Sequence, residues 1–128
     1  MSIMECIGEY RAACKWAKKA VAAARLRDEK KNRECDLSTS LVVECLYSQN
    51  FRCGITNTRL VVDSPEKTKH RFAPSIDRID NLIGYTMNNI HITSVFANFA
   101  RRDAPLDKFI SEFNLRFKNC RVCNVPWT

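Results

Sequence analysis

Two short segments in the middle of the chain alternate between apolar and polar residues, and they constrain the fold more than any other feature. They are Ser75–Ile79 and Asn89–Thr93, and the intervening Asp80–Asn88 contains Gly84 and several turn-forming residues. A period of two places successive side chains on opposite faces of a β-strand. The sequence therefore predicts two β-strands joined by a loop.

Helical periodicity is found on both sides of these strands. Apolar or small residues recur at intervals of three and four, the spacing of one helix face, and residues that can cap a helix precede two of these stretches. The expected helices are Ile7–Arg33, a helix from Ser38 or Ser40 to Gln49, a helix from Val95 to Arg102 capped by Thr93 or Ser94, and a last helix with the apolar stripe Leu106, Phe109, Ile110, Phe113 and Phe117.

Two further β-prone runs, Phe51–Thr56 and Leu60–Val62, predict a short hairpin or bent strand, and the polar Asp63–Pro74 predicts a surface loop.

From these elements together we expect an α+β fold with N-terminal helices, a small β-hairpin (ββα) core and a C-terminal helix. A chain of 128 residues has room for one hydrophobic core. We expect one compact domain that joins a basic helical region (1–50), the ββα core (51–104) and a C-terminal helix with a cysteine-containing tail (105–128).

The composition is that of a globular protein, with 45% hydrophobic and 27% charged residues. No stretch approaches the roughly 18 apolar residues that a membrane span requires, so no membrane partner is expected. The segment Met1–Cys6 lacks the basic and apolar regions of a secretory signal. An intracellular location is therefore expected, where the seven cysteines would stay reduced.

A net charge of +7 and an isoelectric point near 9.2 favour a polyanionic partner such as nucleic acid. Much of the positive charge lies on the first predicted helix, where Lys15, Lys18 and Lys19 share a face. Two interpretations of this face stay open: it contacts phosphates, or it is a solvated face with internal ion pairs.

Three polar residues belong to the predicted strand, loop, strand and helix. Asp77 lies on the first strand, Asn89 opens the second and Asn98 lies in the following helix. A carboxylate and an amide oxygen are ligands that hard divalent cations prefer, so Asp77 and Asn98 are candidates for one metal site. From spacing alone, the alternative is that these residues cap turns or bind the backbone.

The order of several motifs between Cys53 and about Arg102 resembles HNH (ββα-metal) endonuclease-like proteins common in phages. The matching motifs are Cys53-Gly54-Ile55-Thr56-Asn57, Ser75-Ile76-Asp77-Arg78-Ile79-Asp80-Asn81, Gly84-Tyr85-Thr86, Asn89-Ile90 and Asn98-Phe99-Ala100-Arg101. The resemblance implies that Asp77 and Asn98 bind a divalent metal, Mg²⁺ or Mn²⁺, and that Asn89 organises the loop.

Arg78 stands where the family has its general-base histidine. A guanidinium cannot accept a proton at physiological pH, so Arg78 is expected to clamp the scissile phosphate instead. His91 is the leading candidate for the base, because it lies two residues after Asn89 and shares its strand face. The other candidates are Tyr85, His70 and Asp80.

The resemblance leads to two functional hypotheses. The first is a metal-dependent endonuclease that hydrolyses phosphodiester bonds, with DNA as the expected substrate. The alternative is a catalytically degenerate HNH-fold protein that binds nucleic acid or a protein partner, such as a phage inhibitor of a host system. The candidate nucleic-acid-binding residues are Lys15, Lys18, Lys19, Arg101 and Arg102.

Cys120 and Cys123 have the spacing of a zinc knuckle, and Cys45 and Cys53 are candidates for the other two thiolates of a structural Zn²⁺ site. Free cysteines are also common in hydrophobic cores, so this second interpretation stays open. A purely structural zinc protein would leave the pattern from Asp77 to Asn98 unexplained.

Overall fold

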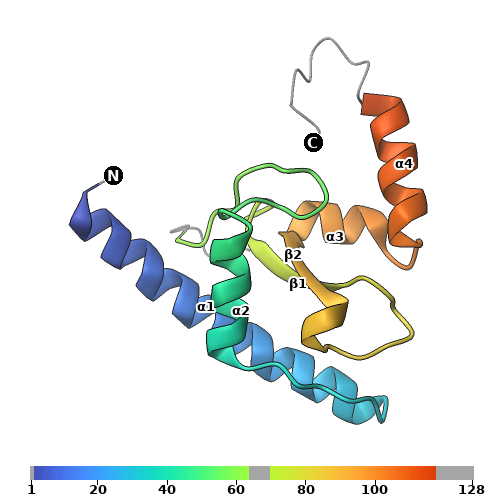
Figure 1. Cartoon of the computed structure of the whole chain (residues 1–128), viewed down its shortest axis with the longest axis horizontal. Helices are drawn as coiled ribbons and strands as arrows, with labels where there is room; N and C mark the ends of the chain where they lie inside the picture. The colour runs from blue at the N-terminus through green and yellow to red at the C-terminus, as the bar shows by residue number, and fades with distance from the viewer. Residues whose placement is uncertain (1, 64–69, 118–128) are drawn as a thin grey trace.

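A computed structural model of the chain describes residues 2–63 and 70–117. Its elements are α1 (Ile3–Lys30), α2 (Thr39–Ser48), β1 (Pro74–Arg78), the single 3-10 turn η1 (Met87–Asn89), β2 (Ile90–Ser94), α3 (Val95–Arg101) and α4 (Leu106–Phe117). Helices α1 and α2 pack against each other on one side of the strand pair, and α3 packs on both strands (Figure 1). This arrangement confirms the predicted α+β fold class.

Helix α1 is built to pack closely against its neighbours. Ser2 and Glu5 form a reciprocal capping box at its N-terminus, which satisfies backbone N–H groups that have no partner within the helix. Its buried stripe consists mostly of small residues: Ala13, Ala17, Val21 and Ala24. Short side chains on this stripe let the buried face of α2 approach closely.

Strands β1 and β2 pair antiparallel, and the register places Asp77 opposite His91. Helix α3 follows β2 without an intervening loop, because the Ser94 hydroxyl accepts a hydrogen bond from the Ala97 N–H at 3.0 Å and caps the helix. Of the two predicted caps, Ser94 is therefore the one used. The direct junction holds the inner face of α3 against β1.

The short hairpin or bent strand predicted between Phe51 and Val62 is present only in reduced form: the Cys53 N–H donates to the Thr58 carbonyl at 2.8 Å and the Leu60 N–H donates to the Phe51 carbonyl at 2.7 Å. Instead of two strands, the segment forms a compact turn with one isolated bridge between Arg52 and Arg59. Positive φ angles at Phe51 and Asn57 bend the backbone out of the extended conformation. The turn is fastened to β2 because the Gly54 N–H donates to the Ile92 carbonyl at 2.8 Å.

The predicted regions 1–50 and 51–104 share one hydrophobic core, which includes residues from Ala13 on α1 to Ala97 on α3. From the stripe predicted on the last helix, Leu106, Phe109 and Ile110 pack against this core. The side chains of Phe113 and Phe117 lie outside the described residues. In the described part of the chain, no helix is long and apolar enough to cross a membrane.

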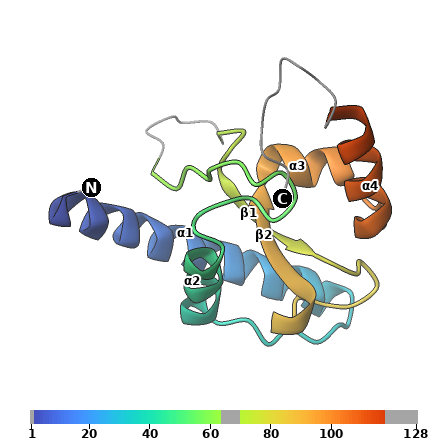
Figure 2. The same ribbon diagram turned by 45° about the horizontal axis from the view of Figure 1, so that its top comes forward.

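The loop between the strands is bound to the end of α1 (Figure 2). The buried Asp28 carboxylate accepts a hydrogen bond from the Tyr85 N–H at 2.7 Å. The preceding Gly84 lies so close to α1 and its exit that an added Cβ would be 2.0 Å from the Glu34 carbonyl oxygen and 2.9 Å from the Asp28 Oδ2 atom. Only glycine fits at this approach.

We expect Gly84→Ala to lower the free energy of unfolding by about 2 to 3 kcal/mol, because the new methyl group would push two backbone segments apart. Gly8→Ala is the matched control: nothing lies within 4 Å of a Cβ there, and Gly8 is inside α1. The control should gain roughly 0.5 to 1 kcal/mol. Urea denaturation measures both, and equal effects of the two substitutions would contradict the close approach at Gly84.

Candidate functional site

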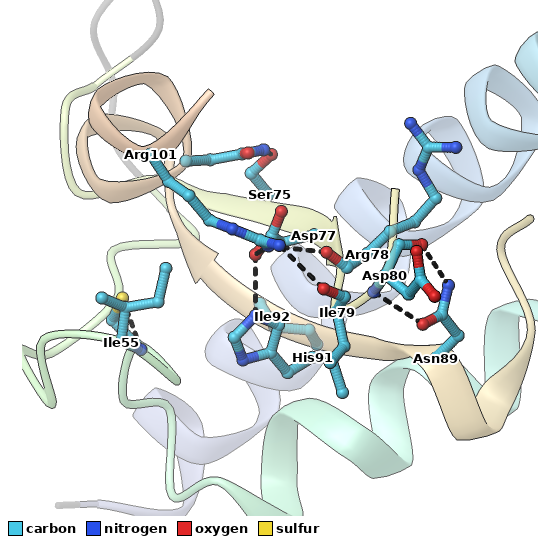
Figure 3. A network of polar contacts seen from close by, with 12 residues as sticks. Ile55, Ser75, Asp77, Arg78, Ile79, Asp80, Asn89, His91, Ile92 and Arg101 are labelled. Carbon is cyan, nitrogen blue, oxygen red and sulfur yellow. Dashed lines mark hydrogen bonds and ion pairs between the residues drawn. The ribbon is translucent and has the colours of Figure 1, made fainter. Parts of the chain in front are cut away.

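Asp77 lies at the centre of a buried polar network that links β1, β2 and α3 (Figure 3). One carboxylate oxygen, Oδ2, receives two contacts: the His91 Nε2 atom at 2.7 Å and the Arg101 Nη1 atom at 2.6 Å. Asp77 itself is only 4% exposed. We refer to Asp77, His91 and Arg101 as the Asp77 network.

Arg101 is 2% exposed, and each nitrogen of its guanidinium has a partner. Nη1 donates to Asp77 and to the Arg78 carbonyl at 2.6 Å, Nη2 donates to the Ile79 carbonyl at 2.8 Å, and Nε donates to the Ala104 carbonyl at 2.9 Å. A buried cation requires this degree of pairing. This geometry argues against the predicted contact of Arg101 with nucleic acid, because its charge is enclosed and paired within the fold.

A strained turn after α3 holds Arg101 in place. Arg102 has φ 52° and ψ −122°, which are the angles of the first central position of a type II′ turn, where glycine is usual. The turn is closed by a hydrogen bond of 3.1 Å from the Ala104 N–H to the Arg101 carbonyl. The same turn brings the Ala104 carbonyl to the Arg101 side chain.

Asn98 contacts Ser75, which lies two residues before Asp77 on β1. Its Nδ2 atom donates to the Ser75 Oγ atom at 2.8 Å. Asn98 and Arg101 are three residues apart on one face of α3, and Ser75 and Asp77 are two residues apart on one face of β1. The helix residue opposite Asp77 is therefore Arg101, so the predicted ligand pair of Asp77 and Asn98 is not brought together by these contacts.

This arrangement does not fit a resident divalent cation. The Asp77 Oδ2 atom is already held by a guanidinium, so a metal ion at that atom would have to displace a buried and fully paired arginine. Within residues 2–63 and 70–117, no group of three or more His, Cys, Asp or Glu side chains is placed to hold a metal ion. The positive charge beside Asp77 comes from the protein itself.

Asn89 holds the loop between the strands together. Its Oδ1 atom accepts from the Asp80 N–H at 2.8 Å, and its Nδ2 atom donates to the Asp80 and Gly84 carbonyls at 2.9 and 3.1 Å. Asn89 is buried. Both polar atoms of its amide are thus engaged by the loop backbone, which is the geometry of an organising residue.

Arg78 points away from the Asp77 carboxylate (Figure 3), as expected for adjacent residues of a β-strand. Its Nη1 atom donates to the Asn81 carbonyl at 3.1 Å, and its guanidinium lies 5.0 Å from the centre of the Tyr85 ring. In this arrangement Arg78 braces the loop. It is not positioned to clamp a phosphate held at Asp77.

His91 is the one predicted base candidate that contacts Asp77. Its ring also lies against Gly54, where an added Cβ would be 2.5 Å from Nδ1. The remaining candidates have local or core contacts. The Tyr85 hydroxyl accepts from Arg27, His70 Nδ1 accepts from the Phe72 N–H, and Asp80 Oδ1 accepts from the Leu82 N–H.

The cysteines predicted to bind zinc are only partly within the described residues. The buried Cys53 sulfur accepts from the backbone N–H groups of Ile55, Thr56 and Ser94 at 3.4, 3.4 and 3.2 Å, so it organises the turn that packs on β2. Burial raises the pKa of the Cys45 thiol, which disfavours the thiolate that zinc binds. Cys120 and Cys123 lie outside the described residues.

On α1, Lys15, Lys18 and Lys19 are exposed on the side opposite the buried alanines. Within the described parts of the chain, none of these lysines is in an ion pair. The contacts in the described residues therefore do not support the interpretation of this face as a solvated surface with internal ion pairs. We refer to these three lysines as the α1 basic face.

In comparisons with known proteins, no family model, curated protein or solved structure matches this chain.

We expect Arg101→Ala to lower the free energy of unfolding by about 3 to 5 kcal/mol, because it leaves the buried Asp77 carboxylate without its cation. Asp77→Ala should have a similar cost, since it leaves Arg101 unpaired. The double variant should lose less than the sum of the two single variants, with a coupling of about 1 to 3 kcal/mol in urea denaturation.

The control for this cycle is Asn98→Ala, which removes one hydrogen bond on the same helix face and should cost about 1 kcal/mol. Additive effects of Asp77→Ala and Arg101→Ala would contradict the proposed dependence of the fold on their contact.

Proposed function

We propose that this chain is a nucleic-acid-binding protein built on an HNH-like ββα unit whose metal position is closed by Arg101. The observation that carries the proposal is the α1 basic face, a cluster of exposed lysines that have no ion-pair partner among residues 2–63 and 70–117, on a protein with a net charge of +7. Lysines at spacings of three and four lie side by side on a helix and can neutralise neighbouring phosphates.

The closed Asp77 network favours binding over metal-dependent cleavage. The Asp77 Oδ2 atom receives both Arg101 and His91, so a metal ion bound to this carboxylate would lie beside the buried Arg101 guanidinium, whose positive charge repels it. The network instead fixes α3 on the strands, which gives the ββα unit a rigid shape. The binding surface is then on the outside of this unit and on α1.

We expect nucleic-acid affinity to fall steeply as the salt concentration rises. In a plot of log affinity against log salt, each phosphate contact should contribute about −0.9 to the slope. Reversing the α1 basic face (Lys15→Glu, Lys18→Glu and Lys19→Glu) should lower affinity at least tenfold at about 0.1 M salt and reduce this slope. Fluorescence anisotropy with a labelled oligonucleotide measures both.

The matched control reverses Lys30 and Lys31 at the end of α1 and Lys108 on α4, which are exposed and give the same change in net charge outside the α1 basic face. A smaller loss for this control assigns binding to the α1 basic face. An equal loss would assign binding to overall charge, and an absence of any nucleic-acid binding by the unmodified protein would refute the proposed function.

A second candidate function, phosphodiester hydrolysis with His91 as the base, is favoured by one observation. Asp77 contacts His91 Nε2 at 2.7 Å, an arrangement that fixes the ring and leaves Nδ1 as the acceptor. Nδ1 lies against Gly54, which also lines a cavity of about 220 Å³ with Gln49, Arg52 and Asn57. Arg52 places a cation beside that cavity.

If His91 is a base, its replacement by alanine should slow cleavage of RNA or DNA by about two to four powers of ten while nucleic-acid binding is retained. Gel assays of the purified protein, with and without EDTA, would measure this. Cleavage that needs added Mg²⁺ or Mn²⁺ would show that Arg101 yields its position to a metal. No cleavage under any of these conditions would leave binding as the function.

A further inference from the structure

Helix α3 turns two phenylalanines toward solvent. Phe96 is 52% exposed and Phe99 is 70% exposed, whereas Ala97 and Arg101 are buried against the strands. Phe96 and Phe99 are three residues apart, so their rings project from the same side of the helix. Adjacent exposed aromatic rings form an apolar patch, and such patches are found at binding surfaces.

Two arginines belong to the segments next to these rings. The Arg102 guanidinium lies 5.3 Å from the centre of the Phe99 ring. Arg71 is exposed, and its carbonyl accepts a hydrogen bond of 2.9 Å from the Phe96 N–H, so its backbone lies beside the start of α3. We refer to Phe96, Phe99, Arg102 and Arg71 as the α3 aromatic surface. The nearest carboxylate in sequence, Asp103, is also exposed.

The backbone at Arg102 supports a role for its side chain. Its φ of 52° and ψ of −122° lie where glycine is the usual residue, and glycine would make the same turn without strain. Strained non-glycine residues cluster at functional sites, where the side chain is needed. At this position the side chain supplies the guanidinium over Phe99.

We propose that the α3 aromatic surface binds unpaired bases of single-stranded nucleic acid. Nucleobases stack on exposed aromatic rings, and neighbouring residues of a helix face have Cβ atoms about 5 to 6 Å apart, which suits two successive bases. Arg102 and Arg71 would pair with the flanking phosphates or stack on the bases. A duplex hides its base faces in its own stack and therefore cannot use this surface.

This inference rests on the proposed nucleic-acid binding and names the class of ligand. It also places a second contact region on α3, an element that is distinct from the α1 basic face. The chemistry favours nucleic acid over an apolar protein partner, because the Arg102 guanidinium lies over Phe99 and the exposed Arg71 is bound through its backbone to Phe96, so both cations can complement an anionic backbone.

The test compares a labelled single-stranded oligonucleotide with a blunt-ended duplex, which has no unpaired loop, in fluorescence anisotropy. Phe99→Ala should weaken single-strand binding by about fivefold to a hundredfold and leave duplex binding unchanged. Leu82→Ala is the matched control, because Leu82 is 85% exposed and lies in the loop between the strands. It should change neither affinity.

Two further variants separate stacking from general apolar contact and from misfolding. Phe99→Trp should retain or strengthen single-strand binding, whereas Phe99→Leu should weaken it. Arg102→Gly should raise the thermal unfolding temperature by relieving the backbone and still weaken single-strand binding. A fluorescent base analogue, 2-aminopurine, in the oligonucleotide should change its emission on binding the unmodified protein and not on binding Phe99→Ala.

Each outcome decides between the two proposals. Equal affinity for single strands and duplex that Phe99→Ala does not change would overturn this inference and leave the proposed function intact. Failure of the unmodified protein to bind either form would overturn both. Loss of single-strand binding alone in Phe99→Ala and Arg102→Gly supports the stacking surface.

Discussion

The ion pair between Asp77 and Arg101 is the contact on which the strand pair and α3 depend. It joins residues 24 positions apart, and it is enclosed so completely that neither partner can be solvated if the other is removed. The Arg101 guanidinium also binds carbonyls of β1, of the loop after it and of the turn after α3. One side chain therefore fixes the orientation of three segments.

The cationic residues discussed above fall into two groups, those paired inside the fold and those exposed to solvent. Arg101 and Arg78 satisfy carbonyl oxygens and a carboxylate inside the ββα unit. Lys15, Lys18 and Lys19 on α1, together with Arg102 beside Phe99, face solvent. Charges that are already paired inside the fold add little to phosphate affinity, so the exposed group determines where a polyanion binds. A resemblance in sequence order to a metal nuclease does not distinguish these two groups.

The helical and ββα parts behave as one unit because the loop between the strands is bound at both ends. Asn89 donates hydrogen bonds to two carbonyls of the loop backbone. The buried Asp28 carboxylate on α1 accepts a hydrogen bond from the Tyr85 N–H. Gly84 permits the close approach that this bond needs. The position of α1, and with it the α1 basic face, is thus tied to the same loop that follows Asp77.

The sequence by itself determined the elements whose signals are local. The small-residue stripe of α1 and the alternation in β1 and β2 depend on neighbours within a few residues, so their periodicity was sufficient. Capping chemistry narrowed each helix start to two residues, and the structure selected Ser38 and Ser94. The tertiary structure alone decided which side chain stands opposite Asp77. Asn98 and Arg101 share one face of α3, and only the packing of that helix on β1 selects Arg101.

The conformation of Phe51–Val62 was also decided by tertiary structure. Its β propensity was overridden by a tight turn and by the hydrogen bond from Gly54 to β2. The exposure of Phe96 and Phe99 could not be predicted from the sequence either. An apolar residue of a helix is buried or exposed according to which other elements pack against it.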